Sequence, residues 1–341
     1  MRKLFLVLAA AALLVSCGPK QTHLPRNTKS GVDTEAFDKV FSDIALAGGT
    51  NELHGIVVLK DGEVIYERYD EGHGPEIKHA LWSASKTFTA TAVGLASDEG
   101  LLSVDDPIIK FFDASELPEN PSDTLKALTI KHLLIMSSGF RHDKLGETEA
   151  LTLKDPTRFM LHDDFRFYPG TQFAYNSMNT YLLSVIVSRV TGKKVADYLG
   201  EKLFTPMGIQ DYWWKESAEG YNMGGWGLFL RTEDLAKMGQ LFLNKGNWNG
   251  KQLVSEKWIN EAMSAQIMQP QPANGRGNED WLAGYGYQMW RNANGSFRLD
   301  GAWGQFGIIS PEKNVVIAVN SICGNAQAFL RYVFEDIYDK I

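Results

Sequence analysis

Segments with the pattern of β-strands lie near both ends of this chain, and segments with helical spacing lie between them. Residues 54–69, HGIVVLKDGEVIYERY, are typical of two strands joined by a tight turn at Asp61-Gly62. Near the other end, GYGYQMW, FGIIS and NVVIAVNS alternate or run apolar as sheet strands do, and residues 311–314 form a turn between the last two. The simplest way to bury these strands is one antiparallel sheet to which both ends of the chain contribute.

Helical patterns surround the predicted sheet strands. Apolar residues recur at helical spacing over 32–46 and again in the final segment, residues 326–341. A long helix is expected from about Ser83 to Glu99, with Gly100 at its C-terminal end. The fold class is therefore α+β, an antiparallel β-sheet flanked by N- and C-terminal helices plus a mostly helical lobe. We assign the sheet lobe to 32–82 and 284–341 and the helical lobe to about 101–283, including predicted helices at 128–136, 181–191 and 232–243.

The first 17 residues have the character of a targeting segment. Arg2 and Lys3 precede an apolar stretch, residues 4–15, that is too short to span a bilayer comfortably. The sequence Leu-Val-Ser-Cys that ends at Cys17 resembles the lipobox of bacterial lipoproteins. This resemblance implies that residues 1–16 are removed as a signal peptide, that Cys17 is lipidated, and that 17–31 form a flexible tether. An exported lipoprotein, anchored in the periplasm or at the cell surface, is expected; a plain secretory signal peptide is the alternative.

Composition excludes several classes of partner. The formal net charge is −7 over 341 residues and there is no block of basic residues, so we expect no nucleic-acid partner. The chain has two cysteines. If Cys17 is acylated, only Cys323 remains and no intramolecular disulfide can form. The seven histidines show no HExxH or other paired spacing and there is no CxxC motif, so we expect neither a metal nor a cofactor.

Ser83 and Lys86 form an SxxK pair at the start of the predicted long helix. The i to i+3 spacing places both side chains on one helix face. A serine hydroxyl becomes a nucleophile when a base takes its proton, and lysine can be that base only if burial or charge lowers its pKa. The backbone amide of Ser83, in the first turn, could hold a developing oxyanion. Taken alone, the pair is more typical of a helix N-cap at Ser83 and a surface lysine at Lys86 than of an active site.

Five blocks of sequence, found in the same order as in a known family, indicate that this pair is an active site. The blocks at 83–108, 128–140, 168–192, 224–255 and 300–319 resemble those of the class C β-lactamase-like serine hydrolases. The resemblance covers about residues 34–341. The sequences Met-Ser-Ser-Gly, Tyr-Asn-Ser and Gly-Gln within these blocks are most similar to the subgroup of 6-aminohexanoate-dimer hydrolase and related esterases. The fold implied is that of β-lactamases and transpeptidases.

The resemblance implies roles for four residues. Ser83 would be the nucleophile, Lys86 its activating base and Tyr175 the third member of the catalytic group. Beside Lys86 the phenolate form of Tyr175 would be favoured, which would let it shuttle protons. The amide of Ala302 would be the second donor to the oxyanion. The activity implied is hydrolysis of a small-molecule amide or ester through an acyl-enzyme.

Two departures from the family pattern bear on the substrate. Where penicillin-recognising members have Lys-Thr-Gly, this chain has Leu299-Asp300-Gly301, which lacks the lysine that meets a β-lactam carboxylate. Arg298 is adjacent, but strand alternation can point it to the other face. The family's Tyr-x-Asn also becomes Tyr-Asn-Ser, so Ser177 would bond the substrate or Lys86. Trp226 and Trp303 are predicted to line the cleft.

Two other functions stay open at this point. The chain could be a D-amino-acid peptidase or a true β-lactamase, which share the same site residues. It could also be a binding lipoprotein whose site no longer turns over substrate.

Overall fold

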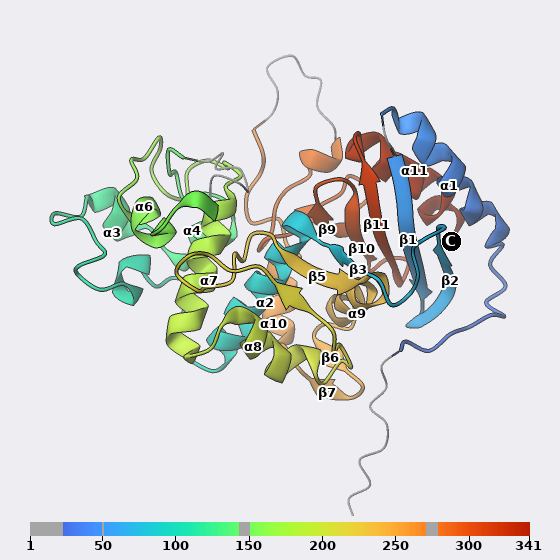
Figure 1. Ribbon diagram of the computed structural model, residues 1–341, viewed down its shortest axis with the longest axis horizontal. Helices are drawn as coiled ribbons and strands as arrows, with labels where there is room; N and C mark the ends of the chain where they lie inside the picture. The colour runs from blue at the N-terminus through green and yellow to red at the C-terminus, as the bar shows by residue number, and fades with distance from the viewer. Residues whose placement is uncertain (1–22, 50, 143–150, 271–278) are drawn as a thin grey trace, which may run out of the picture.

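The computed structural model describes residues 23–49, 51–142, 151–270 and 279–341. The predicted signal peptide and Cys17 lie outside these ranges. The described residues form two lobes, a sheet with helices on its faces and a mostly helical lobe beside it (Figure 1). In the part of the chain described, no helix is both long and apolar enough to cross a membrane.

Both ends of the chain contribute strands to one antiparallel sheet, as the sequence predicted. The strand order is β2-β1-β11-β10-β9-β8, so β1 and β11, which lie far apart in the sequence, are neighbours in the sheet. The strands are β1 (Asn51–Lys60), β2 (Glu63–Tyr69), β8 (Trp290–Arg291), β9 (Phe297–Gly301), β10 (Gln305–Ser310) and β11 (Val315–Cys323).

Residue patterning in β1 explains why the sheet is covered on both faces. Ile56 and Val58 belong to one apolar cluster, and Val57 and Leu59, which point to the opposite face, belong to another. The β1–β2 turn has Asp61 and Gly62 at φ of 54° and 86°, as a tight two-residue hairpin requires.

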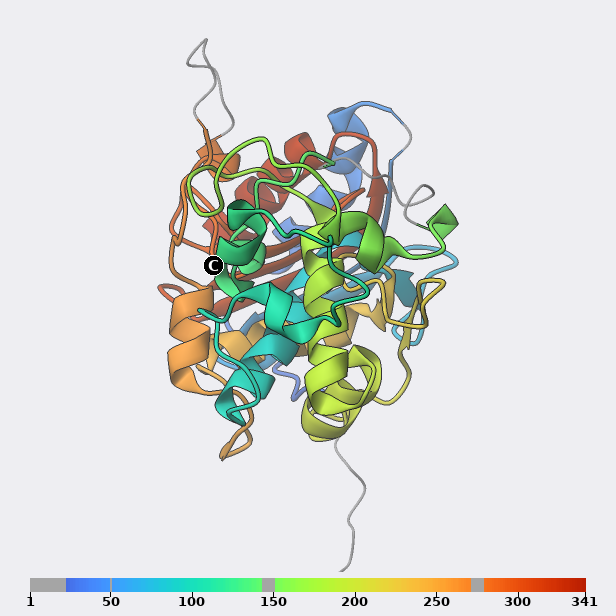
Figure 2. The same cartoon turned by 90° about the vertical axis from the view of Figure 1, so that its left-hand side faces the viewer.

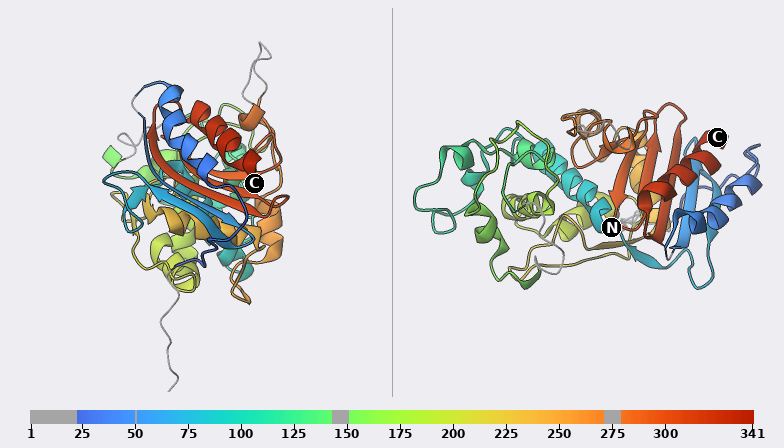
Figure 3. Two further views of the ribbon diagram at one scale, coloured as in Figure 1. Left: turned by 90° about the vertical axis from the view of Figure 1, so that its right-hand side faces the viewer. Right: turned by 90° about the horizontal axis from the view of Figure 1, so that it is seen from above.

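The two faces of the sheet are covered by different helices. Helices α1 (Lys39–Asp43) and α11 (Ala326–Asp336) lie across the outer face (Figure 3). Helix α9 (Thr232–Leu243) packs on the inner face, against β11, β10 and β1. The sequence placed this segment in the helical lobe, which is wrong. Its apolar spacing identified a helix, but spacing alone does not say which surface a helix packs on.

The helical lobe is built around two long helices that pack against each other, α2 and α7 (Figure 2). Its helices are α2 (Ser85–Asp98), α3 (Asp123–Ala127), α4 (Ile130–Leu134), α6 (Pro156–Leu161), α7 (Ser177–Thr191), α8 (Val195–Leu199) and α10 (Glu256–Ala262). The smaller strands form two further sheets: β3 (Lys78–Ala80), β5 (Leu228–Arg231) and β4 (Trp213–Trp214), and separately β6 (Asn247–Trp248) with β7 (Lys251–Gln252).

The segment that carries the SxxK pair differs slightly from the prediction. A short 3₁₀ turn, Trp82–Ala84, precedes α2, so Ser83 lies just before the first α-helical turn rather than within it. Lys86 is in the first turn of α2 itself. Both residues therefore lie at the N-terminal end of a helix that is buried along most of its length.

We predict that the close packing of α2 against α10 does not tolerate a side chain at Gly94. A Cβ at this position would lie 2.5 Å from the Trp258 ring, which is itself buried. Gly94→Val should therefore lower the free energy of unfolding by at least about 2 kcal/mol. Gly74→Val is the control, because Gly74 has no atom within 4 Å of the added Cβ. Urea denaturation of both variants measures this, and equal stabilities would contradict the packing described.

Candidate active site

The side-chain amine of Lys86 lies where three segments of the chain meet. Its Nζ is 3.0 Å from Ser83 Oγ, 3.0 Å from Ser177 Oγ and 2.7 Å from the carbonyl oxygen of Gly225. Ser177 is the first residue of α7, and Gly225 belongs to the glycine-rich loop before β5. The amine is thus surrounded by oxygen atoms from the start of α2, the start of α7 and a loop.

Burial changes the protonation of Lys86. The residue is 1% exposed, and the loss of solvent lowers the pKa of the amine from 10.5 to about 7. The carboxylate of Asp300 opposes this shift, because a nearby negative charge favours the ammonium form. A substantial fraction of Lys86 is therefore neutral near pH 7. In that form its Nζ can accept a proton from the Ser83 hydroxyl.

Tyr175 lies beside the pair, as the sequence predicted, but in a different protonation state. The Lys86 amine is 4.9 Å from the centre of the Tyr175 ring, which stacks on Trp290. Burial raises the pKa of the Tyr175 phenol, and its hydrogen bond with Ser83 only partly opposes this. The phenolate expected beside Lys86 is thus wrong. Burial disfavours the anion, and the negative charge of Asp300 adds to this effect.

Strand β9 brings a buried ion pair to the site. Arg298 and Asp300 are two residues apart and so share one face of the strand, with 2.7 Å between Arg298 Nε and Asp300 Oδ2. The Arg298 side chain is fully buried, also donates to the carbonyl of Asp280 and to Asn292, and lies over the ring of Trp281. Although Nη2 has no hydrogen-bond partner among the residues described, the side chain is fully buried and paired with Asp300, so we expect that Arg298 does not replace the lysine of the family's Lys-Thr-Gly.

The turn after β9 approaches the segment that precedes Ser83. A Cβ on Gly301 would lie 2.2 Å from the carbonyl oxygen of Leu81, so only glycine allows the two backbones to come this close. Ala302, the next residue, is exposed in the turn between β9 and β10. Its amide is therefore carried to the same side of the molecule as the 3₁₀ turn that contains Ser83.

The two tryptophans next to Ser83 and Ala302 have backbone φ angles in the left-handed region. Trp82 precedes Ser83 with φ of 47°, and Trp303 follows Ala302 with φ of 66°. The left-handed region costs a bulky residue on the order of 1–3 kcal/mol. Both side chains line a cavity of about 400 Å³ whose walls are largely apolar. This volume is in the range of pockets that hold small organic ligands.

The remaining predicted residues divide into two groups. Ser177 bonds Lys86, and Trp303 is exposed and lines the cavity. Trp226, predicted to line the cleft, is 6% exposed and belongs to the large core cluster, so that assignment is wrong. Its neighbour Gly225 lies against α7, where a Cβ would be 2.7 Å from the Ser177 carbonyl oxygen.

Two contributors to the site were not assigned from the sequence. The carbonyl of Gly225 could not be recognised because any residue has one, although the run Gly-Gly-Trp-Gly indicated close backbone packing. Asp300 was noted only as part of the sequence that replaces Lys-Thr-Gly. Its spacing from Arg298 was the available signal, because alternate strand residues share a face.

This geometry belongs to a recognised class of hydrolases. The family model described as Beta-lactamase matches residues 47–325, and the chain belongs to this family. It is thus a hydrolase of the β-lactamase fold, a group that includes amidases, esterases and penicillin-binding-protein-like members.

Known proteins similar to this chain include both curated relatives and solved structures. The chain is 26% identical over 276 residues to 6-aminohexanoate-dimer hydrolase of Paenarthrobacter ureafaciens, covering 76% of this chain and 70% of that protein. It is 28% identical over 193 residues to Protein flp of Staphylococcus aureus (strain MW2), covering 50% of this chain and 38% of that protein. The octameric penicillin-binding protein homologue from Pyrococcus abyssi has the same fold, with a TM-score of 0.69, 23% identity, and coverage of 90% of this chain and 78% of that one.

We predict that Asp300 sets the pH at which Lys86 becomes a base. Removing its charge removes the effect that raises the Lys86 pKa, so Asp300→Asn should move that pKa below about 7. Since Lys86 acts when neutral, the variant should be phosphonylated by a fluorophosphonate faster than the wild type at pH 6 and no faster at pH 9. Asp339→Asn, at an exposed position, is the control. Identical pH profiles for all three proteins would contradict the assignment.

Proposed function

We propose that this protein hydrolyses an amide or ester bond through an acyl-enzyme formed on Ser83. The observation that carries the proposal is the buried Lys86 amine 3.0 Å from the Ser83 hydroxyl, with a pKa of about 7. Few buried lysines are kept next to a serine without a role, because the desolvation is costly. The similarity to 6-aminohexanoate-dimer hydrolase, whose name indicates hydrolysis, supports the same reaction class.

In the first step Lys86 takes the Ser83 proton while Oγ forms a bond to the substrate carbonyl carbon. The negative charge that develops on the carbonyl oxygen is held by the amides of Ser83 and Ala302. The tetrahedral intermediate then breaks its bond to the leaving amine or alcohol, which takes a proton that returns from Lys86 through the Tyr175 hydroxyl. Tyr175 acts here as a neutral donor and acceptor, because burial disfavours its phenolate.

In the second step a water molecule attacks the acyl carbon and gives its proton to Lys86. The bond between Ser83 Oγ and the acyl group breaks, and Oγ takes a proton back from Lys86. The acid is released and the enzyme returns to its starting state.

We infer a preference against anionic groups near β9. The position of the family's lysine is taken by Leu299, which is fully buried, and the neighbouring side chain is the acidic Asp300. A β-lactam carboxylate would find no cation there, since Arg298 is already paired. An uncharged amide or ester with an apolar group beside Trp303 fits these residues better than a penicillin does.

Substitution of the three central residues tests the mechanism. Ser83→Ala should abolish acylation, and Lys86→Ala and Tyr175→Phe should each reduce the acylation rate by about 10²–10⁴-fold. Lys126→Ala and Tyr168→Phe are matched controls at exposed positions. The readout is the Ser83 adduct of a fluorophosphonate, measured by mass spectrometry over time. A folded wild-type protein with no adduct would favour a binding protein without turnover.

A substrate panel separates the reaction classes. Purified protein should hydrolyse p-nitrophenyl esters or small anilides at least about tenfold faster than a chromogenic cephalosporin or a D-alanyl peptide. The reason is the missing cation at Leu299, so the cephalosporin should show the larger KM. Fast turnover of the cephalosporin would instead make the protein a true β-lactamase.

We also propose that the protein is exported and held at a bacterial membrane by lipid on Cys17, without a nucleic-acid partner. The lipobox-like sequence that ends at Cys17 supports this. Cys17→Ser should abolish incorporation of labelled palmitate and move the protein from the membrane to the soluble fraction. Equal labelling of Cys17→Ser and wild type would refute lipidation at this position.

A further inference from the structure

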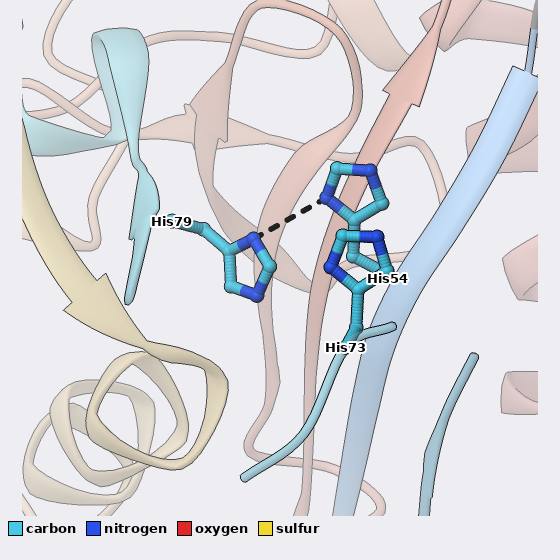
Figure 4. Close-up of side chains that lie close together, drawn as sticks. All are labelled: His54, His73 and His79. Atoms are coloured by element: carbon cyan, nitrogen blue, oxygen red, sulfur yellow. Dashed lines mark hydrogen bonds between the residues drawn. The ribbon is translucent and has the colours of Figure 1, made fainter. Parts of the chain in front are cut away.

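Three histidines from separate segments meet at one end of the sheet. His54 is on β1, His79 is on β3, and His73 lies in the connection between β2 and β3. Each offers one ring nitrogen, and the three nitrogens lie within 4.8 Å of one another. Figure 4 shows the rings of His54 and His73 side by side, with that of His79 facing them.

The spacing of these nitrogens suits a transition-metal ion. The Nδ1 atoms of His54 and His79 are 3.3 Å apart. Two nitrogens bound to one tetrahedral Zn²⁺ at about 2.0–2.1 Å are separated by about 3.4 Å, so this pair needs almost no adjustment. The His73 ring stacks on that of His54 with centres 3.8 Å apart. His73 must therefore turn its ring to present a lone pair to the same ion.

The hydrogen bonding of the cluster is incomplete. Nδ1 of His73 is buried without a hydrogen-bond partner among the residues described, and the Nδ1 atoms of His54 and His79 have only each other as partners. Buried ring nitrogens are normally paired with a donor or acceptor outside such a cluster, so this arrangement calls for an explanation.

We propose that His54, His73 and His79 form a binding site for one Zn²⁺ ion. Three imidazoles are a donor set that zinc commonly takes, with a fourth position left for water or another ligand. Glu52 Oε2 lies 3.5 Å from His54 Nε2, the nitrogen on the far side of the ring from His79. A carboxylate on that side favours the proton on Nε2 and leaves Nδ1 free for the metal.

The site uses none of the residues proposed for catalysis. His54 and His79 line the same cavity of about 400 Å³ as Trp82 and Trp303. An ion held by these histidines would lie at the wall of this cavity. It would also fix the β2–β3 connection, which carries His73, to β1 and β3. Zinc binding stands independently of the proposed hydrolysis.

This site could not be recognised from the sequence because its three residues follow no metal-binding motif. Their spacings of 19 and 6 residues, counted from the printed numbering, are set by a hairpin and the connection that follows it. The expectation that the chain binds no metal rested only on local spacing. The fold brings together three histidines whose spacing in the sequence matches no metal-binding motif.

Zinc titration of the full chain, purified without a histidine tag and stripped of metal, tests the site. Competition against a chromogenic chelator should show one Zn²⁺ per chain. His73→Gln is the first variant, because His73 is half-buried in a connection and its loss should leave the fold intact. It should weaken binding by at least about 100-fold, since even the loss of an outer-shell partner costs 10–100-fold. His162→Gln, which alters a histidine bonded to the Glu116 carbonyl, is the control and should bind as the wild type does.

Cobalt gives a second readout that depends on coordination rather than on activity. Co²⁺ added to the metal-free protein should produce the visible absorption of a tetrahedral ion, and His73→Gln and His79→Gln should lose it. Zn²⁺ should raise the Tm of the wild type and not that of His73→Gln. The proposal is overturned if the wild type binds no Zn²⁺, or if His73→Gln and His79→Gln bind it with wild-type affinity.

Discussion

The rest of this structure depends on the burial of one amine. Lys86 Nζ has almost no contact with solvent, so its hydrogen bonds must come from the protein. They come from Ser83, Ser177 and Gly225, which lie in three segments far apart in sequence. A neutral amine can donate to two of these oxygens and accept from the third, and an ammonium can donate to all three. The same arrangement therefore accommodates both protonation states, as a proton-transferring group requires.

The sheet lobe contributes a charged side chain, Asp300, and the backbone of residues 301 and 302 to the site. Strand β9 ends in Asp300 and Gly301, and Ala302 follows in the turn. Asp300 raises the pKa of Lys86, while burial raises the pKa of Asp300 itself and the ion pair with Arg298 opposes that rise. Gly301 lets this strand end touch the backbone before Ser83. Three successive residues at the end of β9 thus have separate roles. Asp300 shifts the pKa of Lys86, Gly301 allows the close backbone contact, and Ala302 presents its amide.

The sequence was sufficient for the parts of the site that local patterns determine. Ser83 and Lys86 are one helical turn apart, and the order of the family's blocks placed Tyr175 with them. The protonation state of Tyr175 could not be predicted, because it depends on how completely neighbours from other segments exclude water. Gly225 escaped prediction because its contribution is a backbone carbonyl. Trp226 was misplaced because the composition of a loop does not say which way its large side chain points.

The pairing of β1 with β11 has a consequence for how this chain acquires its fold. Asn51 pairs with Cys323 and Lys60 with Val315, so these two neighbouring strands come from segments far apart in the sequence. During synthesis β1 has its hairpin partner β2 within a few residues, but its other edge stays open until the last strand has left the ribosome. Contacts between such distant residues form slowly, and an open strand edge can pair with other chains meanwhile. Until β11 has been synthesised, the nascent protein has an unfinished sheet that a chaperone could bind.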